Sequence, residues 1–89
     1  MPLKVKFSKK FSKQYNKAPA KIRKSFDKRL RLFLQDKFDS QLNNHQLIGK
    51  LKGHRSINIS GDWRAVFREF NAGDLIYFDL LGAHNQLYK

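Results

Sequence analysis

The second half of this 89-residue chain holds a mixed set of groups that could serve as general acids, general bases and phosphate-binding cations. RNA carries its own nucleophile, the 2′-hydroxyl group. Cleaving it without a metal therefore needs a base for that proton, cations for the five-coordinate phosphate and an acid for the leaving 5′ oxygen. An imidazole can fill either proton role near neutral pH, while Lys and Arg stay charged. All three kinds of group occur in His45, Lys50, Lys52, His54, Arg55, Asp62, Arg64, His84 and Tyr88.

Other reaction classes lack their usual motifs. The three histidines form no His-x-x-x-His or Glu-containing metal motif, so we expect no bound metal and no zinc or magnesium hydrolase. Composition alone does not exclude a Ser/His/Asp triad, but there is no Gly-x-Ser-x-Gly elbow and no glycine-rich phosphate loop. No cofactor is expected.

The net charge is large and unevenly distributed. Nineteen Lys and Arg against seven Asp and Glu give +12. Residues 1–37 carry 13 basic and 2 acidic side chains, net +11, whereas residues 38–89 carry 6 and 5, net +1. Such a charge attracts polyanions, so nucleic acid is the leading partner class. The first part supplies this attraction, and any chemistry is expected where charges are few and mixed.

Length and composition favour one globular domain over residues 1–89. A chain this short has room for one core, and 40% hydrophobic residues, including eight Phe, supply it. The absence of cysteine excludes disulfides and thiolate zinc sites. Without an apolar signal region or an 18-residue apolar run, we expect a cytoplasmic protein with no membrane span.

The first 35 residues predict a strand and a helical hairpin. Leu3, Val5 and Phe7 alternate with lysines, which is typical of a strand with one face on the core. Ser8 suits a helix cap, and Pro19 ends the first helix and suits the start of the second.

The second helix combines an apolar stripe with a cationic face. The stripe, at 3.6-residue spacing, is Ile22, Phe26, Leu30, Phe33 and Leu34. The cationic face is Lys21, Lys24, Lys28 and Arg31. Such a face is either solvated or in contact with phosphates, and the excess of one sign favours ribosomal RNA contact.

Residues 38–51 are polar and irregular, and three apolar runs follow, at 56–60, 63–70 and 75–81. Turn residues separate these runs, so they should form an antiparallel meander. The order β-α-α-β-β-β indicates an α+β fold with two helices packed on one sheet.

Four short blocks stand out in the second half: residues 45–49 (HQLIG), 51–55 (LKGHR), 62–64 (DWR) and 82–88 (GAHNQLY). These blocks resemble the signature of YafQ-like toxins in the RelE/ParE superfamily. They occur in the order and spacing typical of that family, and together with the N-terminal strand and hairpin the resemblance spans nearly the whole chain. The Asp-Trp pair and the terminal Gly-x-His-x-x-Leu-aromatic motif are fairly specific.

The resemblance implies a small microbial-RNase-like fold and a toxin of a type II toxin-antitoxin system. It also implies metal-independent cleavage of mRNA, usually in the ribosomal A site, and silencing by an antitoxin encoded alongside. The excess of positive charge suggests that this antitoxin is acidic. By position, His45, Asp62 and His84 match catalytic residues of the YafQ-like branch. Tyr88 matches an active-site aromatic and Trp63 the tryptophan of the motif.

The sequence departs from that branch at Asn58, where a further active-site histidine is expected. An amide hydrogen-bonds but exchanges no proton at neutral pH, so either Asn58 only positions substrate or the proton work is distributed differently. Arg64 stands where several superfamily members carry a phosphate-binding arginine, so it could compensate.

The expected scheme divides the remaining work among the other groups. Asp62 or His45 helps to remove the 2′-hydroxyl proton, and His84 protonates the leaving oxygen with Tyr88 stacking or assisting. Lys52, Arg55 and Arg64 stabilise the phosphorane, and RNA contacts are expected at Lys50, Lys52, Arg55, Asn58 and Trp63.

Less specific interpretations stay open at this stage. Asp62 could be a turn former and Trp63 a core anchor. ParE-like members of the same superfamily poison DNA gyrase without catalytic acids or bases, and the fold does not separate the two activities. A non-enzymatic basic RNA- or ribosome-binding module would explain the charge but not the C-terminal block.

Overall fold

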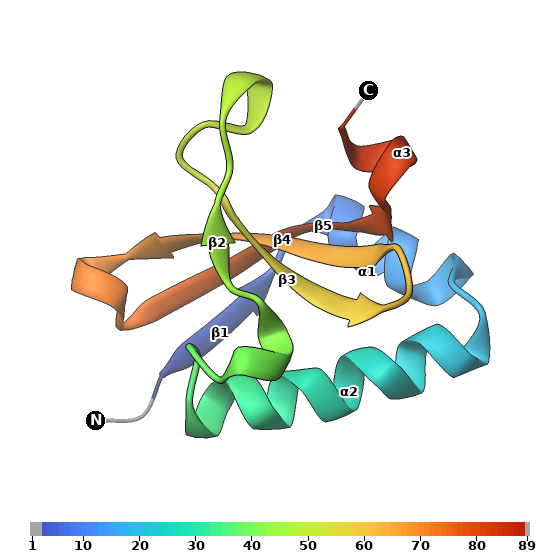
Figure 1. Cartoon of the computed structure of the whole chain (residues 1–89), viewed down its shortest axis with the longest axis horizontal. Helices are drawn as coiled ribbons and strands as arrows, with labels where there is room; N and C mark the ends of the chain where they lie inside the picture. Colours follow the sequence, from blue (N-terminus) through green and yellow to red (C-terminus); the bar gives the residue numbers. More distant parts are fainter. Residues whose placement is uncertain (1–2, 89) are drawn as a thin grey trace.

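The fold is α+β, with a first strand, two helices and then four further strands. One of these four strands has only two residues and was not predicted. The computed structural model describes residues 3–88 (Figure 1). Its elements are β1 (Lys4–Phe7), α1 (Lys9–Lys17), α2 (Ala20–Gln35), β2 (His45–Gln46), β3 (Arg55–Ser60), β4 (Trp63–Phe70), β5 (Leu75–Ala83) and α3 (His84–Leu87). Short 3₁₀ turns lie at Ser40–Leu42, Gly49–Leu51 and Asn71–Gly73.

The strands form one five-stranded sheet in the order β1-β5-β4-β3-β2. The expected meander of β3, β4 and β5 is confirmed, since both of its pairings are antiparallel. β1 pairs with β5 in parallel, so β5 has a neighbour on each side. This interior position explains its nearly continuous apolar run. β2 adds two residues to the other edge, inside the segment that the sequence presented as irregular.

One hydrophobic core joins the helices to the sheet. Phe33 of α2 lies edge-on to Phe67 with ring centroids 5.2 Å apart, and Phe26 lies edge-on to Phe78 at 5.5 Å. The apolar stripe is as expected except at Leu34, which is 46% exposed. Successive helical residues point about 100° apart, so Leu34 lies at the edge of a stripe that is centred on Phe33 and is less covered there.

α1 covers the part of β5 that β1 does not reach. Ser8 caps α1 by accepting from the N–H of Phe11 at 2.9 Å, as predicted, and its hydroxyl donates to the carbonyl of Asp79 at 2.8 Å. One helical turn later, the side-chain oxygen of Gln14 accepts from the N–H of Leu81 at 2.7 Å. These bonds fix the end of β5, from which α3 starts.

A polar contact also links the two helices of the hairpin. The Tyr15 hydroxyl donates to the Asp27 carboxylate at 2.9 Å. This hydrogen bond to an acid raises the pKa of Tyr15 above its ordinary value.

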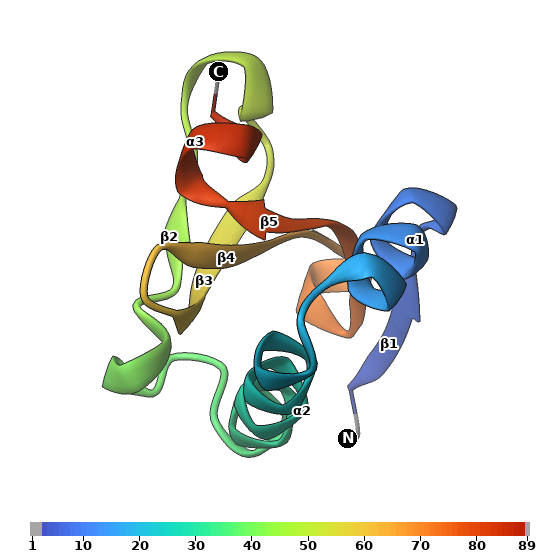
Figure 2. The same ribbon diagram turned by 90° about the vertical axis from the view of Figure 1, so that its right-hand side faces the viewer.

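The two faces of the sheet carry different structures. α2 lies against one face, while α3 and the hairpin loop between β2 and β3 rise from the other, as both views show (Figures 1 and 2). Residues alternate between faces along a strand, so Ile57 and Ile59 enter the core while Ser56 and Asn58 face the loop and α3. No helix of the described residues is long and apolar enough to span a membrane.

Candidate active site

Side chains from three separate segments meet in a shallow pocket of about 260 Å³ on the loop side of the sheet. His45 comes from β2, Arg64 from β4, and His84 and Tyr88 from the C-terminal segment. Leu47 and Ile48 of the hairpin loop form an apolar wall. Four of the five residues predicted to be catalytic therefore lie together, although up to 43 positions separate them in sequence.

The hydrogen bond of His45 selects its tautomer. Its Nδ1 lies 2.7 Å from the carbonyl oxygen of Asn43, and a carbonyl can only accept. Nδ1 must therefore carry a proton, which leaves Nε2 of the neutral ring as a proton acceptor. Pairing of β2 with β3 places His45 opposite Ser56, so the sheet holds the ring at this edge.

His84 is the first residue of α3, directly after the last strand. Its backbone N–H donates to the carbonyl of Asp62 at 2.8 Å, which ties the start of α3 to the β3–β4 turn. The Ala83 N–H donates to the side-chain oxygen of Gln86 at 3.0 Å and closes the first turn. The imidazole of His84 and the ring of Tyr88 meet edge to face, with centroids 4.6 Å apart.

Gly82 allows α3 to fold back so tightly. A Cβ at this position would lie 3.2 Å from Gln86 Oε1 and 3.2 Å from Leu87 Cδ2, closer than ordinary van der Waals contact. The glycine of the terminal motif thus lets His84 sit over the sheet.

Tyr88 has a partner that the sequence did not reveal. Its hydroxyl donates to the Ser56 Oγ at 3.0 Å, and Ser56 is fully buried. A lone serine in a strand carries no sequence signal. Only the pairing of β2 with β3 and the hydrogen bond from Tyr88 show that Ser56 stands between His45 and Tyr88.

Arg64 is braced by its own turn. Its Nη1 donates to the carbonyl oxygens of Gly61 at 2.8 Å and Trp63 at 3.0 Å, so one side of the guanidinium is fixed. The guanidinium has five N–H donors in a rigid plane, and the others are suited to an anion in the pocket.

Three predicted residues lie near the pocket without lining it. Asp62 is exposed in the turn and contributes its backbone carbonyl to His84. Trp63 is half-buried and packs against the core. Asn58 stands opposite Arg64, and its Oδ1 is buried with no hydrogen-bond partner among the described residues.

Two further predicted cations line a second, larger pocket of about 680 Å³. Lys52 and Arg55 belong to it, and Leu47 and Ile48 are common to both pockets. Arg55 is held by its Nε, which donates to Asn44 Oδ1 at 2.8 Å. Lys50 is exposed in the Gly49–Leu51 turn and lines neither pocket.

Comparison with protein families identifies the class of protein. The family model described as "Bacterial toxin of type II toxin-antitoxin system, YafQ" matches residues 3–89. The chain belongs to the YafQ toxin family. Among curated proteins, no sequence matches significantly.

Solved toxins share this YafQ-family fold. The chain is similar to YafQ from E. coli strain BL21(DE3), with a TM-score of 0.81, 19% identity, and 98% of this chain and 99% of that chain covered. It is also similar to a chain of the E. coli DinJ-YafQ toxin-antitoxin complex, with a TM-score of 0.74, 19% identity and 100% of both chains covered. A chain of the archaeal RelE-RelB complex from Pyrococcus horikoshii OT3 has a TM-score of 0.74 and 17% identity, with 97% and 99% covered. The RelE-like fold expected from the sequence is confirmed.

The cationic face of this YafQ-family toxin lies on α2. All four of its side chains are exposed: Lys21, Lys24, Lys28 and Arg31. α2 itself lies on the sheet face opposite the hairpin loop and α3 (Figure 2).

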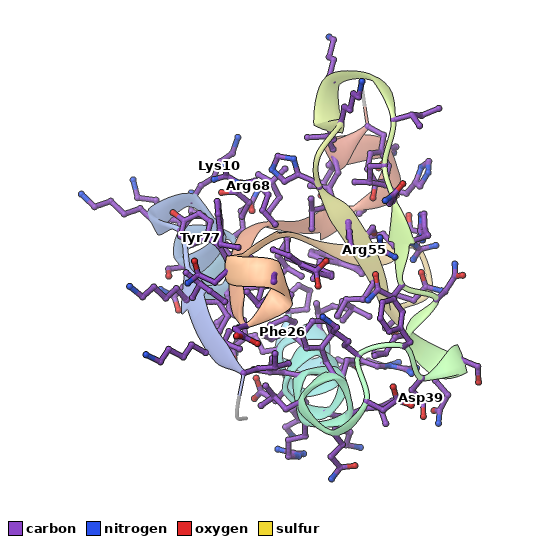
Figure 3. The ribbon with its side chains drawn as sticks, turned by 90° about the vertical axis from the view of Figure 1, so that its left-hand side faces the viewer. Lys10, Phe26, Asp39, Arg55, Arg68 and Tyr77 are labelled. Atoms are coloured by element: carbon purple, nitrogen blue, oxygen red, sulfur yellow. The ribbon has the colours of Figure 1, made fainter. Side chains whose placement is uncertain are left out.

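An acid that the sequence did not single out organises the base of the hairpin loop. Asp79 Oδ2 lies 2.9 Å from His54 Nε2 and 3.1 Å from Arg68 Nε. The Arg68 guanidinium packs over the Tyr77 ring at 5.3 Å (Figure 3). Within residues 3–88 of the toxin, no three His, Asp or Glu side chains are grouped so as to hold a metal ion.

Proposed function

We propose that this YafQ-family toxin is an endoribonuclease that cleaves mRNA by acid-base catalysis with its own side chains. The observation that carries the proposal is the meeting of two imidazoles and a guanidinium in one pocket: His45, His84 and Arg64. These groups supply the proton acceptor, proton donor and cation that attack by the 2′-hydroxyl requires. A protein that only binds a partner has no chemical reason to assemble them.

In the proposed reaction, His45 is the base. Its Nε2, free to accept because Nδ1 is bonded to the Asn43 carbonyl, takes the 2′-hydroxyl proton. The O2′–P bond then forms and gives a five-coordinate phosphate. Asp62, the alternative base, supports the site through its backbone carbonyl instead. Asn58 cannot exchange a proton, so the proton work falls on the two pocket histidines.

The second half of the reaction uses His84 and Arg64. The bond between phosphorus and O5′ breaks, and the protonated His84 gives its proton to the leaving oxygen. The products are a 2′,3′-cyclic phosphate and a 5′-hydroxyl. Arg64 stabilises the extra negative charge of the five-coordinate phosphate, because its braced guanidinium needs little rearrangement. Tyr88 packs against His84 and fixes its ring.

The substrate in this proposal is mRNA on the ribosome, and the α2 cations contact ribosomal RNA. Their support is the exposed cationic face itself and the absence of all four side chains from the lining of the active pocket, which suits a docking role rather than chemistry.

The proposed partner is an acidic antitoxin encoded alongside. The support is the net charge of +12 together with the DinJ-YafQ and RelE-RelB toxin-antitoxin complexes among the similar structures. Such an antitoxin should lay an extended or helical segment over the toxin. Co-expression with the adjacent gene should restore growth, and a neighbour that neither binds nor relieves toxicity would count against this partner.

The proposed function is tested by incubating purified toxin with programmed ribosomes and with the same mRNA free in solution. Cleavage should leave 2′,3′-cyclic phosphate and 5′-hydroxyl ends in at least the ribosomal reaction. Intact mRNA in both reactions, with folded protein at saturating concentration, would contradict it.

A further inference from the structure

The hairpin loop between β2 and β3, residues 47–54, forms a wall of the active pocket but does not belong to the hydrophobic core. Leu47 and Ile48 line the pocket beside His45. Neither of them, nor Leu51, is among the described residues that form the core or pack against it, and Ile48 is 90% exposed. Figure 1 shows the loop rising from the sheet on the side away from α2. Contacts other than core packing must therefore hold this wall in place.

One side-chain contact links the loop to the rest of the protein. The backbone hydrogen bonds of residues 47–54 join loop residues to one another, at 3.0–3.1 Å, and include the bond from the Leu47 N–H to the His54 carbonyl that closes the loop. Within residues 3–88, the only side-chain hydrogen bond of this segment joins His54 Nε2 to Asp79 Oδ2 of β5, at 2.9 Å. The position of the loop on the sheet therefore depends on this contact and on the pairing of β2 with β3.

The hydrogen bond also fixes the state of the His54 ring. The carboxylate of Asp79 accepts, so Nε2 of His54 must carry a proton. Nδ1 is buried and has no hydrogen-bond partner among the described residues. The ring is thus held through Nε2 alone, and another side chain that offers an N–H at the same place could replace it.

The anchor of the loop on β5 is itself firmly held. Asp79 lies on an interior strand, and its backbone carbonyl accepts from the Ser8 hydroxyl at 2.8 Å. Its carboxylate also lies 3.1 Å from Arg68 Nε. The Arg68 guanidinium packs over the ring of Tyr77, its partner on the neighbouring strand (Figure 3). A loop bound to Asp79 therefore takes its position from the interior of the sheet.

The strand that carries His45 is so short that both of its ends need support. β2 has two residues and pairs with β3 at two positions. Before His45, the side-chain amide of Asn44 donates to the carbonyl of Lys37 at 2.9 Å. After it, the Leu47 N–H continues the pairing to the His54 carbonyl. Segments with few buried contacts open locally, so a freed His54 would leave this end of β2 unsupported.

We propose that the contact between His54 and Asp79 is a tether that positions the hairpin loop and, through it, His45 in the active pocket. His54 is then a positioning residue, which touches no reacting atom and acts through the strand that holds the base. The effect on cleavage rests on the proposed ribonuclease function, whereas the effect on the loop does not.

The test compares His54→Leu, which removes the N–H donor, with His54→Gln, which keeps a donor at a similar reach. In His54→Leu, hydrogen exchange of the Leu47 amide should become about tenfold faster, while that of the core residue Phe67 stays slow. Single-turnover cleavage at saturating toxin should also fall about tenfold, with the half-saturating concentration changed less than twofold. Tenfold is the lower end for a hydrogen bond to a charged group, because both side chains are partly exposed. His54→Gln should recover most of both losses.

Tyr15→Phe is the matched control. It removes a hydrogen bond to a carboxylate of the same length, 2.9 Å, from the helical hairpin. Both the Leu47 exchange rate and the cleavage rate should stay within twofold of the parent. Asp79→Asn keeps the shape of the anchor without its charge and serves as a second variant if His54→Leu does not fold. It should change both quantities in the same direction by a smaller factor.

Three outcomes would overturn the tether. Leu47 exchange could be unchanged in His54→Leu, His54→Gln could be as impaired as His54→Leu, or faster exchange could leave the maximal cleavage rate undiminished. A change confined to the half-saturating concentration falls under the last of these and would assign His54 to substrate binding. A parent toxin that cleaves no mRNA, while Leu47 exchange still depends on His54, would contradict the ribonuclease alone.

Discussion

The α2 face and the candidate active site are both polar surfaces, yet they are built in opposite ways. The α2 face takes like charges from one helix, all exposed and set by a local repeat. The active pocket takes a histidine from β2, an arginine from β4, and a histidine and a tyrosine from the C-terminal segment.

The difference separates attraction from chemistry. Like charges on a helix act over a Debye length of about 8 Å at physiological salt and need no fixed geometry. Proton transfer needs heavy atoms within about 3 Å, so its groups must be braced. The pocket has such braces at Asn43, Gly61 and Ser56, each within 3.0 Å of the side chain that it holds.

The largest effect is expected at His84. His84→Gln should keep the fold and ribosome binding but lower single-turnover cleavage by roughly two to four orders of magnitude, the usual share of general acid-base catalysis. Asn85→Gln, an exposed change on the same helix, is the matched control. A rate for His84→Gln within a few-fold of the parent at saturating toxin would move the acid role to His45 or Tyr88.

Arg64 should come next. Arg64→Gln removes the cation aimed at the developing charge and should lower the cleavage rate by roughly 10²–10³-fold, as loss of one oxyanion donor does. Arg64→Lys should recover only part of the rate because Lys lacks the rigid fork. Both variants are compared in single-turnover cleavage of programmed ribosomes, and full activity in Arg64→Lys would show that charge without geometry suffices.

Reversal of the α2 face should affect binding without affecting chemistry. The quadruple change to Glu should weaken ribosome affinity about tenfold or more and reduce its salt dependence, while the rate of the bound complex stays the same. The changed residues are Lys21, Lys24, Lys28 and Arg31. The matched control reverses four exposed charges of α1: Lys9, Lys10, Lys13 and Lys17. Equal losses of ribosome affinity in both variants would show that the α2 face is merely a solvated surface.

The smallest effect is expected at the brace of Tyr88. Tyr88→Phe keeps the ring against His84 but removes the hydroxyl that donates to Ser56, so cleavage should fall by only about two- to tenfold. Ser56→Ala should have a similar effect, and the double variant should be no worse than either single variant, since all three lose one bond. Additive losses in cleavage rate would show that the two residues act separately.

The sequence predicted the features of this fold that depend on neighbouring residues. It missed those that arise only when distant segments meet. Periodicity located both helices and the three long strands, and Ser8 marked the first cap. The strand at His45 has two residues, too few to show an alternating pattern, and α3 is a single turn, too short to show a helical one. The exposure of Leu34 depends on how far the sheet extends beneath the edge of the apolar stripe, which periodicity does not show.

The same distinction applies to the candidate site. Residue types pointed to His45, Arg64, His84 and Tyr88, which the structure places in one pocket. No sequence pattern distinguishes Lys52 and Arg55, which line the other pocket, from these four residues. Nor does a pattern mark Ser56 or Asp79, because their contacts with Tyr88 and His54 form only when β3 pairs with its neighbours and the hairpin loop closes.

The central claim, that this toxin cuts mRNA through the pocket of His45 and His84, is tested most directly by primer extension on mRNA from cells after brief induction. The toxin and its His84→Gln variant are compared at matched protein levels. The account predicts cuts within coding sequences, at in-frame positions where cleavage occurs on the ribosome, and their loss in the variant. Intact mRNA in growth-arrested cells, accompanied by gyrase-dependent DNA breaks, would contradict it and assign the toxin to the ParE-like activity.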